Sequence, residues 1–253
     1  MEEIAEQGVA TYFVGNFNPS IVTPHWLFTQ DILTQKEADK AEVEVIHKDL
    51  SRFAVSGLKF EVTTDRFHVF AEAEPFIRLC DIAIILFKVA LPHTPIKAAL
   101  LNYYIHARLE SFDQRLRFGR KFAPVEPWGD LAPLFDGDSP EKMGGLVDLT
   151  MQMSRKDDVE GLMRVILQPS NRIPEPSGIF VQVTNSFEEL RSLDEISEKK
   201  PKPRKSKKKG EQKAEEIGRQ DGYYPQLLVE HFDEYLSKSK EITENLLRMG
   251  LSS

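Results

Sequence analysis

Hydrophobic residues near the N-terminus of the chain change their spacing as the sequence proceeds. Residues 9–17 are rich in Val, Thr, Tyr and Phe and end at Asn18-Pro19, a pattern typical of a strand. Residues 26–41 have helical spacing, and Thr34 is followed three residues later by Glu37, the signature of a capping box. The pattern predicts a strand followed by a helix.

Alternating apolar and polar residues follow this helix. They predict three short strands, over 42–47, 58–62 and 67–71, joined by tight turns as an antiparallel meander. An apolar stretch over 76–90 then predicts a buried helix, which Pro75 opens because a residue in the first helical turn needs no N–H partner. This stretch contains three charged residues and is shorter than the roughly 20 residues that cross a bilayer, so we expect no membrane contact.

The rest of the chain repeats this order of elements. Residues 96–109 are predicted as a long strand, 111–122 as an amphipathic helix, and 146–153, 162–168 and 179–184 as three further strands. Pro225 opens a final helix over 224–248, whose apolar residues recur every three or four positions. Since this helix is about 36 Å long at 1.5 Å per residue, we expect its end to overhang a small domain, where a partner or a second copy could cover it.

The two series of elements predict an α+β fold. We expect a pseudo-twofold duplication of a β-α-β-β-β-α unit, with antiparallel sheets that join or face each other and long helices on one face. The halves are residues 1–92 and 93–253, although they share no clear sequence identity. The element order is similar to that of the TATA-binding-protein-like saddle and, more loosely, of helix-grip folds, a likeness that carries no function.

Charge is distributed unevenly along the chain. The 253 residues carry a net charge of −7, from 33 basic and 40 acidic residues. A segment over 199–209 holds eight basic residues and no acidic one: Lys199, Lys200, Lys202, Arg204, Lys205, Lys207, Lys208 and Lys209. Without them the rest of the chain is about −15, since 25 basic residues then stand against 40 acidic ones. The surrounding residues 193–222 have almost no apolar side chains, so we predict a disordered loop.

Composition and motifs exclude several classes of protein. With Cys80 alone, an intrachain disulfide and a Cys-based zinc site are impossible, which indicates a reducing compartment. The acidic N-terminus lacks the order of a signal peptide, so we expect a cytoplasmic protein. The sequence contains no Gly-rich dinucleotide fingerprint, phosphate-binding loop, zinc-protease motif or nucleophile elbow. We therefore predict no cofactor, and an enzyme is the less favoured interpretation.

Candidate chemistry is sparse in the remaining sequence. The six histidines fall on different predicted elements, and no pair has the spacing of metal ligands on one helix, so we predict no metal site. Cys80 lies in the apolar helix and is expected to be a small core residue. Asn16 and Asn102 lie in the first strand of each half and could face a shared groove, although a turn explains the first and a cross-strand polar pair the second.

Charged residues also gather on or beside the meander strands. Two acids of the first meander strand share one of its faces, because side chains alternate with a period of two. A nuclease-like carboxylate cluster could be built there, although an exposed charged sheet face is the preferred interpretation. The residues concerned are Glu42, Glu44, His47, Glu61, Asp65 and Arg66.

Several short segments of the sequence resemble those of known families. They are Ala41-Glu42-Val43-Glu44-Val45-Ile46-His47, Ser51-Arg52-Phe53, Val62-Thr63-Thr64-Asp65-Arg66-Phe67, Leu91-Pro92-His93-Thr94-Pro95-Ile96 and Glu126-Pro127-Trp128-Gly129. Through them residues 8–190 resemble a widespread family of uncharacterised bacterial proteins and, distantly, a sporadically distributed bacterial family found near defence and mobile elements. The resemblance implies a bacterial origin and an accessory or antiviral-defence setting, and it transfers no catalytic residue.

Three functions remain as expectations. The preferred one is a non-catalytic interaction or scaffold protein that binds a protein partner or a second copy of itself. The alternative is a nucleic-acid-binding component, in which the Lys-rich segment contacts phosphates without sequence specificity. A hydrolase with a strand-borne carboxylate cluster has the lowest weight.

Overall fold

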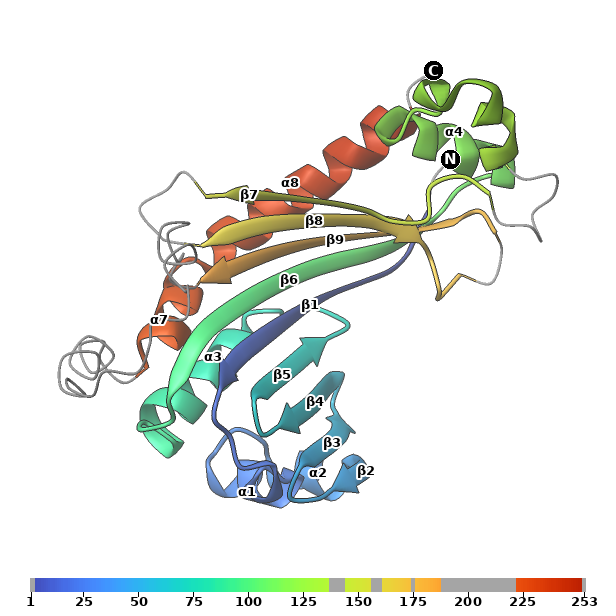
Figure 1. The fold of residues 1–253 in the computed structure, drawn as a ribbon. Coiled ribbons are helices and arrows are strands. Elements are labelled where there is room, and N and C mark those ends of the chain that lie inside the picture. The colour runs from blue at the N-terminus through green and yellow to red at the C-terminus, as the bar shows by residue number, and fades with distance from the viewer. Residues whose placement is uncertain (1–2, 137–143, 156–160, 174–175, 188–221, 252–253) are drawn as a thin grey trace, which may run out of the picture.

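The computed structural model describes residues 3–136, 144–155, 161–173, 176–187 and 222–251. The fold is α+β, as the sequence predicts, and its centre is one continuous antiparallel sheet rather than two. The nine strands lie in the order β2-β3-β4-β5-β1-β6-β9-β8-β7 (Figure 1). Their bounds are β1 (Glu3–Gly15), β2 (Glu42–Ile46), β3 (Leu50–Val55), β4 (Leu58–Thr63), β5 (Arg66–Ala71), β6 (Ile96–Arg108), β7 (Leu149–Ser154), β8 (Leu162–Pro169) and β9 (Gly178–Phe187).

The meander in the first part of the chain has four strands, not the three that the alternation predicts. The missed strand is β3, where Ser51 is fully buried although it is polar. Its hydroxyl donates to the carbonyl oxygen of Val22 at 2.6 Å, which satisfies it inside the core. This buried polar residue interrupts the apolar alternation, so the pattern alone did not reveal the strand.

The helix predicted over 26–41 is two short helices, α1 (Pro24–Thr29) and α2 (Gln35–Asp39). The predicted capping box is confirmed, because the Thr34 hydroxyl accepts from the Glu37 N–H while the Glu37 carboxylate accepts from the Thr34 N–H. Asp31, with a φ of 57°, lies between the two helices and turns the chain. A short 3₁₀ turn, η1 (Pro19–Ile21), precedes α1.

The apolar helix begins later than predicted. Pro75 follows a cis peptide bond, and the chain forms a turn before α3 (Arg78–Ile84) continues into the π-helical η2 (Ile85–Ala90). Pro75 is therefore not in the first turn of this helix. The N–H of Arg78 bonds the Pro75 carbonyl three residues back, a turn-type contact that separates the proline from the helix.

The later helices include one correction. α4 (Phe112–Phe122) follows the predicted span, and Ser111 caps its N-terminus. The predicted final helix is two helices, α7 (Tyr223–Glu230) and α8 (Phe232–Leu251), separated at His231. They part because α7 packs on α3 and β6, while α8 runs along β9 and β6 to reach α4. An irregular 3₁₀ segment, η3 (Glu126–Asp136), follows α4.

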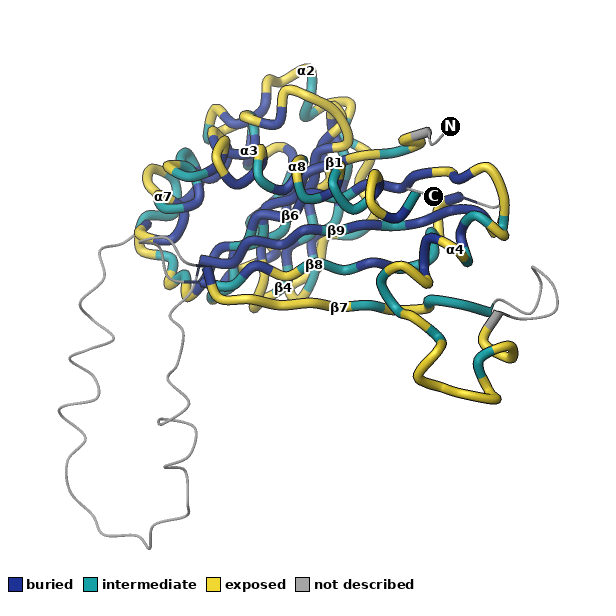
Figure 2. The backbone as a smooth tube through the Cα atoms, turned by 90° about the horizontal axis from the view of Figure 1, so that it is seen from above, coloured by how far each residue is buried: buried dark blue, intermediate teal, exposed yellow. Residues whose placement is uncertain are grey.

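The core lies between one face of the sheet and the helices α3, α7 and α8 (Figures 1 and 2). On β1, Val9, Thr11 and Phe13 point into it. The end of α8 packs on α4 of the same chain: Gly250 lies so close to Phe118 that a Cβ atom there would come within 2.3 Å of the ring. We call the sheet surface that carries this core the covered face and the opposite surface the open face.

Among the described residues, no helix is long and apolar enough to span a membrane.

Candidate functional site

A groove of about 800 Å³ lies on the open face of the sheet. Residues of β1, β2, β3, β4, β5, β6, β8 and β9 line it, together with Asn171 and Arg172, which follow β8. Eight aromatic or imidazole residues belong to its lining. Phe53 and Phe60 bury their rings in the core, and the other six are Tyr12, His68, Phe70, Tyr104, His106 and Phe180.

Strand alternation and register bring these rings together. Tyr12 lies between Thr11 and Phe13, which point to the covered face, and Tyr104 lies between Tyr103 and Ile105, which are likewise buried there. Antiparallel pairing then sets His68 of β5 opposite Tyr12 and Phe180 of β9 opposite His106. The groove floor is therefore the alternate set of positions on strands whose other set makes the core.

Gly8 leaves room for two rings of the groove floor, Phe70 and Tyr104. Gly8 lies opposite Tyr104 in the register of β1 and β6. A Cβ atom at this position would come within 2.5 Å of the Phe70 ring and 2.8 Å of the Tyr104 hydroxyl. Because glycine has no side chain, Phe70 and Tyr104 can stack above it, with ring centroids 5.2 Å apart.

Tyr12 and His68 form the most nearly parallel ring pair of the groove. Their centroids are 3.9 Å apart and their planes differ by 7°. Burial lowers the pKa of His68 to about 4, although the nearby carboxylate of Glu61 opposes the shift. Burial, followed by Glu61, raises the pKa of Tyr12, and a hydrogen bond from Asn102 offsets part of this rise. Both rings are neutral at physiological pH, so the pair presents a planar, uncharged surface.

Asn102 is the predicted groove residue that lies in the lining. It is nine-tenths buried, and its Oδ1 has no hydrogen-bond partner among the described residues. Asn16 is exposed just beyond the end of β1 and does not line the groove. The structure therefore does not bring the two asparagines together. His68 shares the feature of Asn102, because its buried Nε2 also lacks a partner within the described part of the chain.

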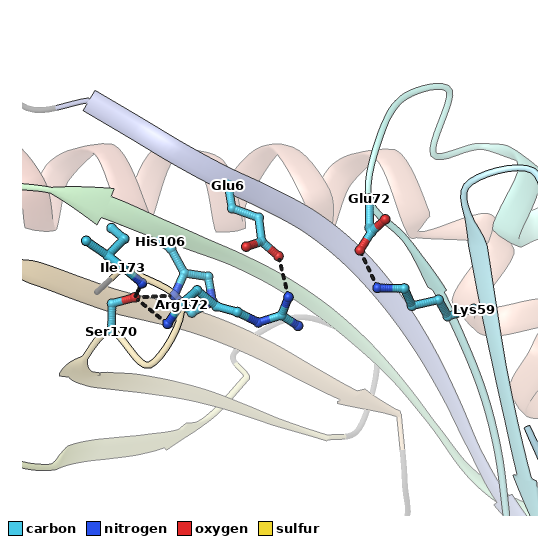
Figure 3. Close-up of polar contacts among 7 residues, drawn as sticks. All are labelled: Glu6, Lys59, Glu72, His106, Ser170, Arg172 and Ile173. Carbon is cyan, nitrogen blue, oxygen red and sulfur yellow. Dashed lines mark hydrogen bonds and ion pairs between the residues drawn. The ribbon is translucent and has the colours of Figure 1, made fainter. Parts of the chain in front are cut away.

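A second polar cluster lies at the β8 end of the groove (Figure 3). The Ser170 Oγ accepts hydrogen bonds from the backbone N–H groups of Arg172 and Ile173, at 3.1 and 3.0 Å. Its own proton then donates to Nδ1 of His106, 2.8 Å away, which assigns His106 as the neutral Nε2–H tautomer. Burial lowers the pKa of His106, in agreement with that assignment. The cluster holds the turn after β8 against the groove, where Arg172 pairs with Glu6 at 3.3 Å.

Charged side chains at the groove are engaged in ion pairs. Arg52 bridges Glu44 and Glu61 at 2.9 and 2.8 Å. Lys59 pairs with Glu72 across β4 and the end of β5 (Figure 3). Four carboxylates thus pair with three cations around the groove. Because each cation has a carboxylate beside it, the groove does not present the concentrated positive charge that a phosphate backbone requires.

The residues considered for a nuclease-like cluster do not converge on one site: some line the groove and the others lie outside it. Glu42, Glu44 and Glu61 line the groove, but the last two are held apart by Arg52 between them. His47 is exposed beside Asp49. Asp65 and Arg66 pair weakly, 3.7 Å apart, at the exposed start of β5. No group of three or more His, Cys, Asp or Glu residues within the described ranges could hold a metal ion.

Two further predictions concern Cys80 and the Lys-rich segment. Cys80 is buried in α3, as predicted, and burial raises the pKa of its thiol to about 12, which removes the thiolate needed for reactivity. The Lys-rich segment over 199–209 lies outside the described residues, as does most of the predicted loop over 193–222.

The apolar face of each strand predicts the core but not the rings of the groove floor, which lie on the opposite face. The signal was present in β6, where Tyr104 and His106 alternate with Tyr103, Ile105 and Ala107. A strand whose two faces both carry rings indicates a second packing surface, and Tyr or His on one of them indicates the face that meets water.

No model of a protein family matches the chain, and no curated protein sequence matches it.

Proposed function

We propose that this protein is a non-catalytic interaction module whose groove on the open face binds a peptide segment of a partner protein. The observation that carries the proposal is the groove floor, where six rings line a cavity of about 800 Å³. Aromatic side chains bury large areas with little loss of conformational entropy, and they dominate the energy of many interfaces.

The polar lining favours a peptide as the ligand. Between the rings lie the side-chain amides of Asn102, Gln168, Asn171 and Gln182. A side-chain amide both donates and accepts hydrogen bonds, as a peptide group does. A segment with an aromatic or apolar residue could insert that residue between the rings while its backbone bonds to these amides. The paired charges at the groove leave few unpaired ions to be desolvated when such a segment binds.

The groups that might perform chemistry are occupied in structural roles. The Ser170 oxygen accepts two backbone N–H groups, which occupy the lone pairs that a nucleophile would use, although Nδ1 of His106 lies 2.8 Å away, where a base would lie. The carboxylates of Glu44 and Glu61 are held by Arg52. These contacts support binding rather than hydrolysis as the function of the groove.

The strand order supports the finer prediction of an internal duplication. Read outward from the centre, the sheet is β1-β5-β4-β3-β2 on one side and β6-β9-β8-β7 on the other. Each side begins with a strand of 13 residues, continues through an antiparallel meander and ends in helices on the covered face. We infer two related halves, over 1–92 and 93–253, that meet at β1 and β6, so that the groove lies across their junction. The bacterial defence or mobile-element setting stays a prediction of the resemblance alone.

The test selects ligands from a random-peptide display library on the immobilised full chain. Selected peptides are then titrated against the unmodified protein, Tyr104→Ala, Phe180→Ala and a matched control, Trp128→Ala, which removes an exposed ring of η3 away from the groove. We expect the two groove variants to weaken binding at least tenfold and the control to leave it unchanged. A library that yields no binder, or peptides that bind all four proteins alike, would refute the proposal.

The nucleic-acid alternative rests on the eight basic residues over 199–209. It predicts that a fluorescent single-stranded oligonucleotide binds the full chain, that affinity falls steeply with salt, and that deletion of 199–209 abolishes binding. The groove variants should leave such binding intact, because each cation of the groove lining is paired with a carboxylate. Equal binding by the deleted and full chains, or none by either, would exclude this alternative.

A further inference from the structure

The two edges of the sheet differ in how they are protected. β2 forms one edge and β7 the other (Figure 1). β2 carries Glu42 and Glu44, both exposed, and its pairing with β3 shifts register between Val43 and Val45. Charged residues and bulges are two devices by which proteins prevent an edge strand from pairing with another chain.

β7 has neither device. Its sequence, Leu-Thr-Met-Gln-Met-Ser, contains no charged residue and no proline. Its ladder with β8 runs without a register shift from the Leu149–Leu167 pair to the Ser154–Leu162 pair. Figure 2 shows β7 exposed along most of its length, and within the described residues no strand pairs with its outer edge.

Two methionines make this edge apolar. Met151 is 65% exposed and Met153 is 53% exposed, and both point to the same side of the sheet because they are two residues apart. Methionine is flexible and polarizable, so it adapts readily to a neighbouring apolar surface. An uncharged, regular edge with exposed apolar side chains is the form of edge strand that accepts another strand.

We propose that β7 pairs antiparallel with β7 of a second copy of this chain, across a twofold axis, so that the two sheets become one. The absence of charge on β7 favours a second copy of this chain as the strand that pairs with it. A twofold axis brings a strand against itself, and β7 can do this without repulsion because it has no charge. The same operation at β2 would bring Glu42 and Glu44 toward their own copies.

Side-chain alternation restricts the register of this pairing. Residues directly opposite in an antiparallel pair point to the same face of the sheet. Because both strands are copies of β7 and side chains alternate along it, two opposite residues must both have odd numbers or both have even numbers. A centre at Gln152 pairs Gln152 with itself, Met151 with Met153 of the other copy, and Thr150 with Ser154 of the other copy. This register covers both exposed methionines and leaves five residues of each strand paired.

The first experiment measures molar mass in solution by light scattering over a wide range of concentration. We expect the unmodified chain to reach twice 28.9 kDa. Met151→Lys with Met153→Lys should shift it to a single-chain mass at every concentration, while Val43→Lys with Ile46→Lys, a matched change at exposed apolar residues of β2, should leave the dimer intact. Circular dichroism checks that each variant is folded.

A charge exchange tests the register itself. In Met151→Glu with Met153→Lys, each new carboxylate lies opposite a new amine of the other copy, so we expect the dimer to return. Met151→Glu with Met153→Glu should remain a single chain. A single-chain mass for the unmodified protein, a dimer that survives the double lysine change, or loss of the dimer in the β2 control would each overturn the proposal.

Crosslinking gives an independent measurement. Opposite residues of an antiparallel pair have Cα atoms about 4.5–5.5 Å apart, within the range of a disulfide. Because the native Cys80 is buried, Gln152→Cys introduces the only accessible thiol of the described residues. Mild oxidation should yield a covalent dimer of this variant and none of Val43→Cys, the control on β2. No crosslink at position 152, or an equal crosslink at position 43, would contradict pairing through β7.

Discussion

The open and covered faces of the sheet use neighbouring residues of the same strands for different purposes. On the covered face, Phe13 and Phe67 pack edge-on or tilted against Phe87, with centroids 4.8 and 5.4 Å away. On the open face, Tyr12 and His68 stack nearly parallel. Most covered rings are phenylalanines, with three tyrosines among them, whereas most open rings carry a hydroxyl or an imidazole nitrogen.

This difference shows how the two faces of one strand can contribute to a core and to a candidate binding surface. A buried phenylalanine needs only dense packing, whereas a ring at the boundary with water gains from a polar atom that keeps its hydration or finds a partner. The same hydrophobic alternation therefore produces two surfaces, and the chemistry of the ring distinguishes them.

The largest expected contrast is in stability. Phe13→Ala removes a fully buried ring from the covered face and should lower the free energy of unfolding by about 3–5 kcal/mol. Phe180→Ala removes a partly buried ring from the open face and should cost about 1 kcal/mol or less, because water can fill the space. Urea unfolding of both variants measures the difference, and equal losses would show that the two faces are not distinct.

Gly8 offers a smaller effect confined to the open face. In Gly8→Ala the new methyl would press against Phe70 and Tyr104, so we expect a loss of about 1–3 kcal/mol from overpacking. The ring stack must open, and binding of peptides selected on the groove should weaken with it. The double variant Gly8→Ala with Tyr104→Ala should recover part of the stability but not the binding. A Gly8→Ala protein as stable as the original would mean that the rings yield without cost.

His68 gives the smallest effect, which appears only on acidification. Its pKa is about 4 in the folded protein, below its ordinary value near 6.5, so the unfolded chain takes up a proton first as the pH falls. Stability contributed by the neutral ring is thus present above about pH 6.5 and is lost between pH 6.5 and 4. His68→Phe keeps a ring beside Tyr12 and should reduce the loss between pH 7.5 and 5.5 by about 1 kcal/mol. Thermal unfolding across this range checks it, and parallel profiles for the two proteins would rule out His68 as the cause.

Sequence reasoning identified most strands but not all boundaries. β1, β6, β8 and β9 were found because one face of each is apolar over many residues. β3 was missed because Ser51 is buried through a hydrogen bond to Val22, a partner 29 residues away. The break at His231 was missed for a similar reason, since α7 and α8 turn toward different neighbours while their apolar spacing continues.

The candidate groove was predictable only in part. Asn102 was selected as a polar residue in an apolar strand, and it does line the groove. Its neighbours in space come from strands far along the chain: Tyr12 lies ninety residues before it, and Gln182 eighty residues after it. Registers between such distant strands depend on packing that no local pattern records.

The sequence by itself determined the features that depend on nearby residues. These are the alternation of the strands, the capping box of α2, the burial of Cys80 in an apolar helix and the α+β class. Only the tertiary structure decided that one sheet forms rather than two, which face the helices cover, how six rings meet in a groove and which edge strand lacks protection. The physical reason is range: propensity and capping act within a few residues, whereas register, covering and edge exposure arise from contacts between strands that the chain brings together only when it folds.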